Sequence, residues 1–231
     1  MKAFLLAAGH GTRLRPLTDT TPKCLLPVRG TPMLSIWLDL CRRHGICDVL
    51  VNAHSHGGQI RDYLDAHRNG VQTRVVDEPV LLGSAGTVSA NRDWVAGERC
   101  FWILYADVLT NADLGRMAQS HLEGRRLATL GGYEVPDPER CGIMQVDAEG
   151  VVRGFVEKPK TPAGRLAFAG LMIADVALLD QIPESRPADL GFDVLPRLAG
   201  KAAAWPISGY LLDIGTLENY ELAQNTWPGL D

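Results

Sequence analysis

Short apolar runs alternate with helical patterns along the first half of the chain, and this alternation limits the possible folds more than any other feature. Four runs have the composition of buried strands, at residues 2–8, 47–52, 71–77 and 100–107. Three segments instead repeat apolar residues at helical spacing, at residues 32–44, 57–68 and 85–95. Strands that alternate with helices predict a parallel sheet covered by helices and joined by right-handed crossovers.

The pattern changes after Gly124, where strands follow one another directly. Strands are expected at residues 126–135, 141–146, 151–158, 168–174 and 202–207, with an extended segment at 209–215. The residues DAEG at 147–150 predict a hairpin turn between the second and third of these strands. Helices are expected near 176–182, near 193–199 and at 216–227, the last capped by Thr216.

These patterns together predict one α/β domain over residues 1–231. We expect a Rossmann-like, doubly wound, mostly parallel sheet into which an antiparallel part is inserted. Its two halves are expected at residues 1–123 and 124–231. A hydrophobic content of 46% in 231 residues is enough for a sizeable buried core.

Charge and cysteine content narrow the class of protein. The formal net charge of -4, with both signs spread along the chain, argues against a nucleic-acid partner. The longest apolar runs are too short to cross a bilayer, and the first residues do not have the pattern of a signal peptide. Five cysteines without a C-x-x-C motif favour a reduced protein. We therefore expect a cytoplasmic protein without a membrane partner.

The segment AAGHGTRLRPLTDTTPK, at residues 7–23, is long for a connection after a strand. A glycine-rich loop in this place can present backbone N–H groups to anions. The P-loop motif is not matched, because the required lysine is missing. The dinucleotide fingerprint is not matched either, because Leu14 stands where the third glycine belongs. Neither a standard P-loop NTPase nor an NAD enzyme is indicated.

The longer pattern GHGTRLRPLT, followed by PKCLLPV, resembles the sugar-1-phosphate nucleotidyltransferase family. Members of this family join a nucleoside triphosphate to a sugar 1-phosphate and release pyrophosphate. The matching residues are Gly9, Gly11, Thr12, Arg13, Leu14, Pro16, Leu17, Thr18, Pro22, Lys23, Leu25, Pro27 and Val28.

The resemblance gives the loop a chemical interpretation. The nucleotide-binding residues would be Ala7, Ala8, Gly9, Gly11, Thr12 and Arg13. Arg13 offers a planar fork to the β- and γ-phosphates, and Lys23 offers a point charge to the α-phosphate. Arg15 is equally consistent with an assisting role and with a solvated surface residue.

The segment DEPVLLGSAGTV looks like the base- and sugar-reading loop of the family. It adds the nucleotide-binding candidates Gly83, Ser84, Ala85 and Gly86, and Glu78 corresponds to the acidic residue before the loop. Uridylyl- and thymidylyltransferases more often carry a glutamine here, and none occurs between Glu78 and Asn91. The resemblance therefore favours GTP as the donor.

Two aspartates are the metal candidates. Asp107 ends a buried strand, and ligands bind at the carboxyl ends of strands in doubly wound sheets. Asp213 lies in YLLDIGT, which matches the second metal aspartate of the family. The resemblance implies that both bind Mg²⁺, a hard cation that prefers oxygen ligands. Arg13, Lys23 and Asp107 are the catalytic candidates.

The segment CGIMQVDAEGVVRGFVEKP resembles the sugar-binding half of the family. Gly142, Glu157, Lys158 and Gly170 are the candidates for binding the sugar phosphate. Phe168 departs from the pattern, because many relatives have asparagine there. Asn52 lies at the end of a strand and is kept outside the core assignment.

Three functions remain open from the sequence. The first is a guanylyltransferase for a heptose or mannose 1-phosphate, in surface polysaccharide synthesis, which the short chain favours. The second uses UTP or CTP on another acceptor, such as muramate 1-phosphate, glucose 1-phosphate or phosphocholine. The third is a non-catalytic nucleotide-sugar sensor, against which Lys23, Asp107 and Asp213 argue. The partners are small molecules, and the sequence is also compatible with a homodimer.

Overall fold

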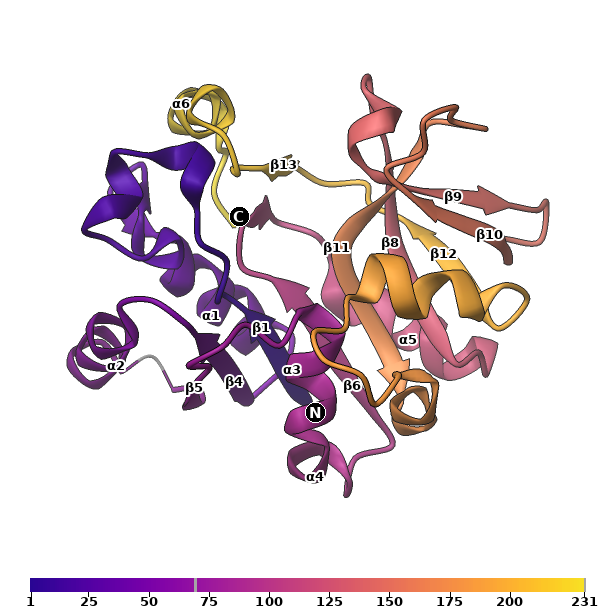
Figure 1. Ribbon diagram of the computed structural model, residues 1–231, viewed down its shortest axis with the longest axis horizontal. Helices are drawn as coiled ribbons and strands as arrows, with labels where there is room; N and C mark the ends of the chain where they lie inside the picture. Colours follow the sequence, from indigo (N-terminus) through magenta and orange to yellow (C-terminus); the bar gives the residue numbers. More distant parts are fainter. Residues whose placement is uncertain (69, 231) are drawn as a thin grey trace. The chain divides into compact units, whose positions relative to one another are not determined.

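The computed structural model describes residues 1–68 and 70–230, which form two compact units (Figure 1). The first unit comprises Met1–Leu81, Leu104–Leu114 and Ser208–Asp231, and the second comprises Leu82–Ile103 and Gly115–Ile207. These boundaries differ from the expected halves, because residues 82–103 belong to the second unit and residues 208–231 to the first.

The first unit is built on three parallel strands, which lie side by side in Figure 1: β1 (Lys2–Leu6), β4 (Asp48–Ala53) and β5 (Gln72–Asp77). In the register of the sheet, Phe4 pairs with Leu50 and Leu50 with Arg74. The helices of this part are α1 (Met33–Arg43) and α2 (Gly57–Ala66), and α2 packs against β5. These elements confirm the expected alternation.

Short elements complete the first unit and shape its loops. Three 3₁₀ turns follow β1, namely η1 (Thr12–Leu14), η2 (Leu17–Asp19) and η3 (Lys23–Leu25). Two small antiparallel pairs are formed by β2 (Pro27–Val28) with β3 (Thr31–Pro32), and by β7 (Val108–Thr110) with β13 (Leu211–Asp213). The last helix is α6 (Leu217–Thr226), and the Thr216 side chain caps it by accepting a hydrogen bond from the Asn219 amide at 3.2 Å.

The second unit contains the antiparallel part of the fold. Its strands are β8 (Ala128–Glu134), β9 (Gly142–Val146), β10 (Val152–Glu157), β11 (Leu166–Asp175) and β12 (Ala202–Pro206). β8 pairs antiparallel with β11 and parallel with β12, and β9 with β10 forms the expected hairpin. β6 (Cys100–Tyr105) is divided, because residues 100–103 belong to this unit and residues 104–105 to the first.

Helices in the second unit differ in detail from the expectation. The segment 85–95 forms two helices, α3 (Ser84–Ala90) and α4 (Arg92–Val95). They are separated at Asn91, whose side chain donates to the Thr87 carbonyl at 2.9 Å and so competes with the helix backbone. The helix expected near residues 176–182 is a 3₁₀ helix, η5 (Val176–Gln181). In place of the helix expected near residues 193–199, the chain forms a π-turn, η6 (Leu190–Val194), followed by a 3₁₀ turn, η7 (Leu195–Leu198). Pro196 cannot donate a backbone hydrogen bond, which disfavours a regular α-helix there. The helix α5 (Leu114–Gly124) was not expected from the sequence.

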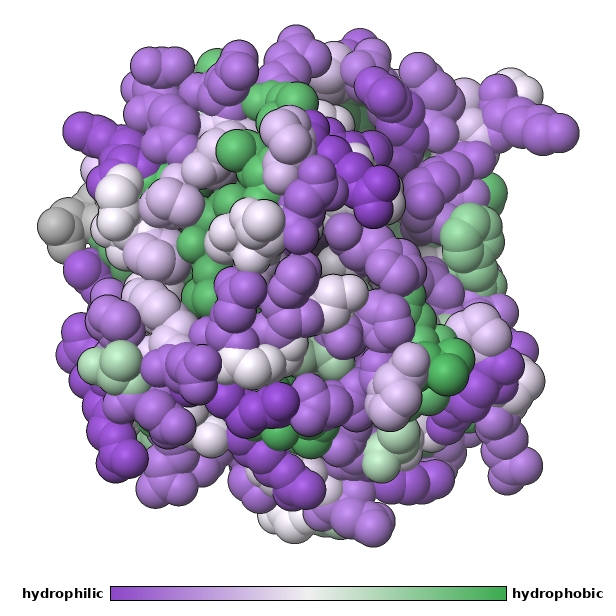
Figure 2. Space-filling view, turned by 60° about the vertical axis from the view of Figure 1, so that its left-hand side comes forward, coloured by the Kyte–Doolittle hydropathy of each residue, from purple (hydrophilic) through white to green (hydrophobic). Residues whose placement is uncertain are grey.

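The fold class is confirmed as mixed α/β with a mostly parallel central sheet. Large side chains such as Phe4, Trp37 and Trp102 are fully buried in the core. Hydrophilic side chains cover most of the face in Figure 2, where apolar residues show in smaller areas between them. Within residues 1–68 and 70–230, no helix combines the length and the apolar character that crossing a membrane requires.

Candidate active site

The glycine-rich loop after β1 has a conformation that depends on Gly11. Its φ of +62° lies in the left-handed region, and a Cβ atom there would lie 2.9 Å from Thr18 Cγ2. The Thr18 hydroxyl donates to the Gly11 carbonyl at 2.8 Å, and the Leu14 amide donates to the same oxygen at 2.9 Å. In the described part of the chain, no group accepts a hydrogen bond from the amides of residues 9–11. Three successive backbone donors are thus available to an anion.

Two buried residues fix the beginning of this loop. The Ala7 amide donates to Asn52 Oδ1 at 2.7 Å, and Asn52 Nδ2 donates to Glu78 Oε1 at 2.9 Å. Asn52 and Glu78 are each 4% exposed, so the bond between them is shielded from water, whereas the bond to the Ala7 amide is partly buried. Sequence reasoning kept Asn52 outside the core assignment, although a polar residue at the end of an apolar strand is the signal that could have identified it.

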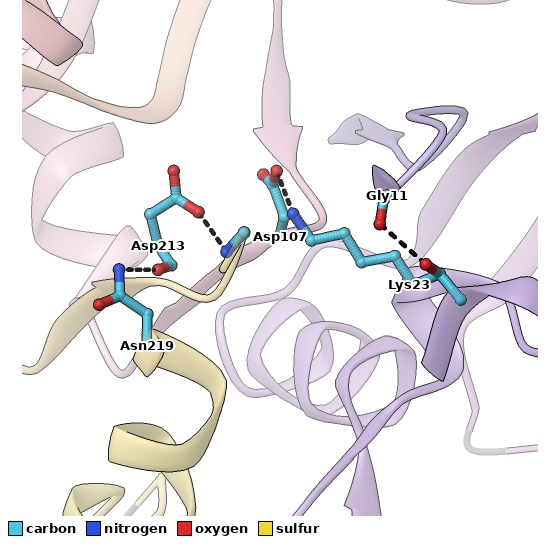
Figure 3. A network of polar contacts seen from close by, with 7 residues as sticks. Gly11, Lys23, Asp107, Asp213 and Asn219 are labelled. Atoms are coloured by element: carbon cyan, nitrogen blue, oxygen red, sulfur yellow. Dashed lines mark hydrogen bonds and ion pairs between the residues drawn. The ribbon is translucent and has the colours of Figure 1, made fainter. Parts of the chain in front are cut away.

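Lys23 and Asp107 form an ion pair beside the loop. The Lys23 Nζ atom donates to Asp107 Oδ2 at 2.7 Å, and the two side chains are 11% and 34% exposed (Figure 3). Lys23 begins η3, whereas Asp107 follows β6. The Ala106 amide donates to the Leu6 carbonyl at 3.0 Å, which holds Asp107 next to the end of β1. The structure thus brings together two residues that lie 84 positions apart.

Asp213 reaches the same place through the pairing of β13 with β7. Asp213 pairs with Val108 in that register, and the Ile214 amide donates to the Asp107 carbonyl at 2.9 Å. Removal from water and then the Asp107 carboxylate raise the pKa of Asp213, whereas Lys23 lowers it. Two carboxylates are therefore held close enough to repel each other.

Gly215 allows the charged side chains to converge. A Cβ atom at this position would lie 2.7 Å from Asp213 Oδ1, 2.8 Å from Arg13 Nη2 and 3.3 Å from Lys23 Nζ. The Gly215 amide also donates to Asp213 Oδ1 at 2.6 Å, the contact drawn to Asp213 in Figure 3. Any larger residue would displace these groups.

A cavity of about 250 Å³ lies over this cluster in the first unit. It is lined by Leu6, Ala7, Gly9, His10, Gly11, Thr12, Arg13, Lys23, Cys24, Ala106, Asp107 and Gly215. Most of the expected phosphate-binding residues and one of the two expected metal ligands therefore line one cavity. Ala8 lines an adjoining hollow of about 150 Å³, together with Arg15. Arg15 forms an exposed pair with Asp19 at 3.1 Å, which favours its interpretation as a surface residue.

The second unit holds the other candidates, beginning with the loop before α3. The Ser84 hydroxyl donates to Asp189 Oδ2 at 2.9 Å and accepts from the Leu190 amide at 2.7 Å. The amides of Ala85 and Gly86 both donate to the Ala188 carbonyl at 3.0 Å. These donors serve a contact within the unit, so the predicted nucleotide role of residues 83–86 stays a prediction.

Glu157 lies beside this contact. A Cβ atom at Gly191 would meet Glu157 Oε2, and it would lie 3.2 Å from Asp189 Oδ1. A Cβ atom at Gly142 would also meet Glu157 Oε2. Burial raises the pKa of Glu157, Lys158 lowers it, and Asp189 raises it further. Asp189 was not predicted from the sequence, because its contact with Ser84 depends on a loop that returns 105 residues later in the chain.

The remaining sugar-phosphate candidates differ in what they offer. The Lys158 Nζ atom lies 3.7 Å from Glu157 Oε1 and 5.9 Å from the centre of the Phe192 ring. Gly170 has a φ of +71° and lies where the register of β11 shifts. Phe168 contacts the ring of Phe155 edge to face, with ring centres 6.4 Å apart. Phe168, which departs from the family pattern, thus takes part in an aromatic pair.

Comparison with known proteins places these features in a family. The family model described as nucleotidyl transferase matches residues 2–227. The chain is 31% identical over 238 residues to a UTP–glucose-1-phosphate uridylyltransferase of Synechocystis, covering 95% of this chain and 61% of the relative. It is 30% identical over 223 residues to a mannose-1-phosphate guanylyltransferase of Mycobacterium tuberculosis, covering 94% and 62%. The chain therefore spans about three fifths of the length of these relatives.

Two solved structures resemble this chain over nearly its whole length. A Bacillus anthracis protein, proposed to be a glucose-1-phosphate thymidylyltransferase and crystallised with sucrose, matches with a TM-score of 0.87 at 25% identity, covering 97% of this chain and 94% of that one. HddC from Yersinia pseudotuberculosis matches in fold with a TM-score of 0.83 at 23% identity, covering 98% and 99%. Since the family model spans nearly the whole chain, this chain belongs to the nucleotidyl transferase family.

Proposed function

We propose that the chain transfers a nucleotidyl group from a nucleoside triphosphate to a sugar 1-phosphate, with Mg²⁺ as cofactor and pyrophosphate as the second product. The observation that carries this proposal is the convergence of Arg13 and Lys23 on Asp213, beside the amides of residues 9–11, from which no described group accepts a hydrogen bond. Cationic side chains and consecutive amides suit a polyphosphate, because they bind its oxygens from several directions.

The proposed reaction is a direct displacement at the α-phosphorus. An oxygen of the acceptor phosphate forms the new bond to this phosphorus, and the bond to the β-phosphate breaks, with its electron pair leaving on pyrophosphate. Arg13 and the amides of residues 9–11 hold the leaving group, and Lys23 stabilises the charge at the reacting phosphorus. The acceptor phosphate is already ionised at neutral pH, so no strong general base is required.

The acidic pair fits the magnesium ion that the family implies. Asp107 raises the pKa of Asp213, and a divalent cation would relieve this repulsion. Asp107 and Asp213 would hold the ion, which when bound neutralises phosphate charge. In the second unit, Glu157 would bind sugar hydroxyls and Lys158 the acceptor phosphate.

We propose GTP as the first donor to test, and a heptose or mannose 1-phosphate as the acceptor for surface polysaccharide synthesis in the cytoplasm. The loop LLGSAG and the absence of a glutamine between Glu78 and Asn91 support GTP. The uridylyltransferase relative supports UTP as the alternative donor. A matrix of nucleoside triphosphates against sugar 1-phosphates, read by pyrophosphate release, separates the two. Binding of a nucleotide sugar without any turnover would instead indicate a sensor.

The metal assignment predicts the behaviour of one variant. Asp107→Asn should lower turnover at least about 100-fold, because it removes a charge that would hold the cation and that pairs with Lys23. Asp113→Asn is the matched control, since Asp113 lies nearby in the chain but outside the cavity, and it should keep activity. Chelation of the metal should abolish turnover by the unsubstituted chain, and Mg²⁺ should restore it. Full activity of Asp107→Asn in the presence of chelator would contradict the assignment.

Direct displacement also predicts the stereochemical outcome. Without a covalent enzyme intermediate, the configuration at the α-phosphorus should invert. A GTP analogue with a chiral α-phosphorothioate reports this configuration in the nucleotide-sugar product. Retention would mean two displacements and a nucleotidyl-enzyme.

A further inference from the structure

A second cavity lies in the second unit and shares no residue with the candidate active site. Its volume is about 440 Å³, in the range of small-molecule pockets. It is formed where β6 begins, where α5 ends and where β11 passes into η5. Its lining residues are Arg99, Cys100, His121, Leu122, Arg125, Arg126, Leu127, Asp175 and Ala177.

The charge of this lining is predominantly positive. Three arginines line the cavity, and Asp175 is the only carboxylate among the lining residues. Asp175 Oδ1 already accepts a hydrogen bond from the Ala177 amide at 2.9 Å. Arg126 donates to the Gly200 carbonyl at 3.2 Å. The Arg99 backbone carbonyl accepts from the Val176 amide at 3.1 Å, but the guanidinium groups of Arg99 and Arg125 make no hydrogen bond or ion pair with any described residue. These two guanidinium groups are therefore available to a ligand.

His121 adds a buried polar group to the wall. Its side chain is only 4% exposed, and its Nδ1 atom lies 3.0 Å from the Thr129 hydroxyl. No described residue bonds its Nε2 atom, that atom is not among the fully buried unpaired atoms, and His121 is one of the residues that line the cavity. Burial lowers the pKa of His121, which favours the neutral ring. When Thr129 donates to Nδ1, Nε2 carries the proton and can donate to a ligand.

We propose that this cavity binds the phosphate group of a small molecule. Arg99 and Arg125 would each present a planar fork to phosphate oxygens, and His121 Nε2 would donate from the buried side. A dianionic phosphate suits this lining better than a monoanion, because three guanidinium groups face a single carboxylate. The same chemistry fits free phosphate and a phosphorylated metabolite, so both are tested.

The test follows the His121 ring itself, because the active site should also bind phosphate. The protein is labelled with ¹⁵N-histidine, and inorganic phosphate or glycerol 2-phosphate is titrated at constant pH and ionic strength. The His121 resonances should shift and saturate. In Arg99→Gln/Arg125→Gln, the apparent affinity should fall about tenfold or more, as expected when hydrogen bonds to a charged group are lost.

A matched variant controls for general loss of charge. Arg197 is exposed in the second unit and lies outside the cavity, so Arg197→Gln should bind like the unsubstituted chain. Tighter binding of glycerol 2-phosphate would assign the site to a phosphorylated metabolite, and tighter binding of inorganic phosphate would assign it to the free ion. A His121 shift that does not saturate, or that is equal in the double variant and in Arg197→Gln, overturns the proposal.

Discussion

At the scale of single residues, Lys23 has a geometry that suits transition-state stabilisation. Its ammonium group is only slightly exposed and is held by Asp107 at 2.7 Å. A charge that is fixed before the reaction needs no reorganisation when negative charge develops at the phosphorus. In the proposed reaction, the lysine should therefore contribute more to the chemical step than a mobile surface lysine could.

This geometry predicts how Lys23→Ala should behave. Loss of a preorganised electrostatic donor costs about 3 kcal/mol, or roughly 10²–10³ in rate. The loss should appear in kcat at saturating substrates, with KM little changed. Lys160→Ala removes an exposed lysine outside the cavity and should leave both constants near their original values. A rise in KM alone would make Lys23 a substrate-binding group instead.

At the scale of the elements, the ends of three parallel strands cooperate. The chain of hydrogen bonds runs from Ala7, after β1, through Asn52 in β4 to Glu78, after β5. The Glu78 backbone carbonyl also accepts a hydrogen bond from His54 Nδ1, which lies 2.6 Å away and directly follows β4. The sheet thereby fixes the first amide of the loop that carries the unpaired donors.

Asn52→Ala should therefore affect both stability and binding. It leaves the Glu78 carboxylate buried without its amide partner, which costs about 1–3 kcal/mol. Nucleotide affinity should also fall, because the start of the loop is no longer held. Asn225→Ala is the control, since Asn225 makes an exposed contact within α6, and its effect should stay within about 0.5 kcal/mol. Urea unfolding and nucleotide titration measure the two effects, and unchanged values for Asn52→Ala would exclude this role.

The sequence predicted elements better than it predicted contacts. Strands such as β4 and β6 follow from continuous apolar runs, and the start of α6 follows from the capping residue Thr216. The helix α5 was missed although Asp113, a residue type favoured at helix N-caps, directly precedes it and Leu114 and Met117 stand at helical spacing. The contact of Asp189 with Ser84 was missed because only the folded loop brings the two residues together. Asp107 and Asp213 were found because family motifs mark them, whereas their pairing requires the β7–β13 register.

At the scale of the whole molecule, each unit contains a histidine whose neutral form is favoured by burial. Burial lowers the pKa of His44 in the first unit, where Asp113 partly opposes the effect. Burial also lowers the pKa of His121 in the second unit. At these two histidines, the unfolded chain then binds more protons than the folded chain below about pH 6.5. The histidine contribution to stability is complete above that pH and is lost as the pH falls.

Buried carboxylates have the opposite effect on the pH dependence of stability. The histidine contribution must therefore be measured by comparing a variant with the unsubstituted chain. The pKa values of Asp213 and Glu157 are raised in the folded chain, so protonation of these groups favours folding as the pH falls. The difference between a variant and the unsubstituted chain cancels this contribution.

His121→Gln should therefore lose less stability between pH 7.5 and 5.5 than the unsubstituted chain, measured by urea unfolding at both pH values. His67→Gln replaces an exposed histidine and should retain the full pH dependence. An unchanged pH dependence in His121→Gln would mean that His121 is protonated equally in the folded and unfolded states. Its ring would then be more hydrated than its burial indicates.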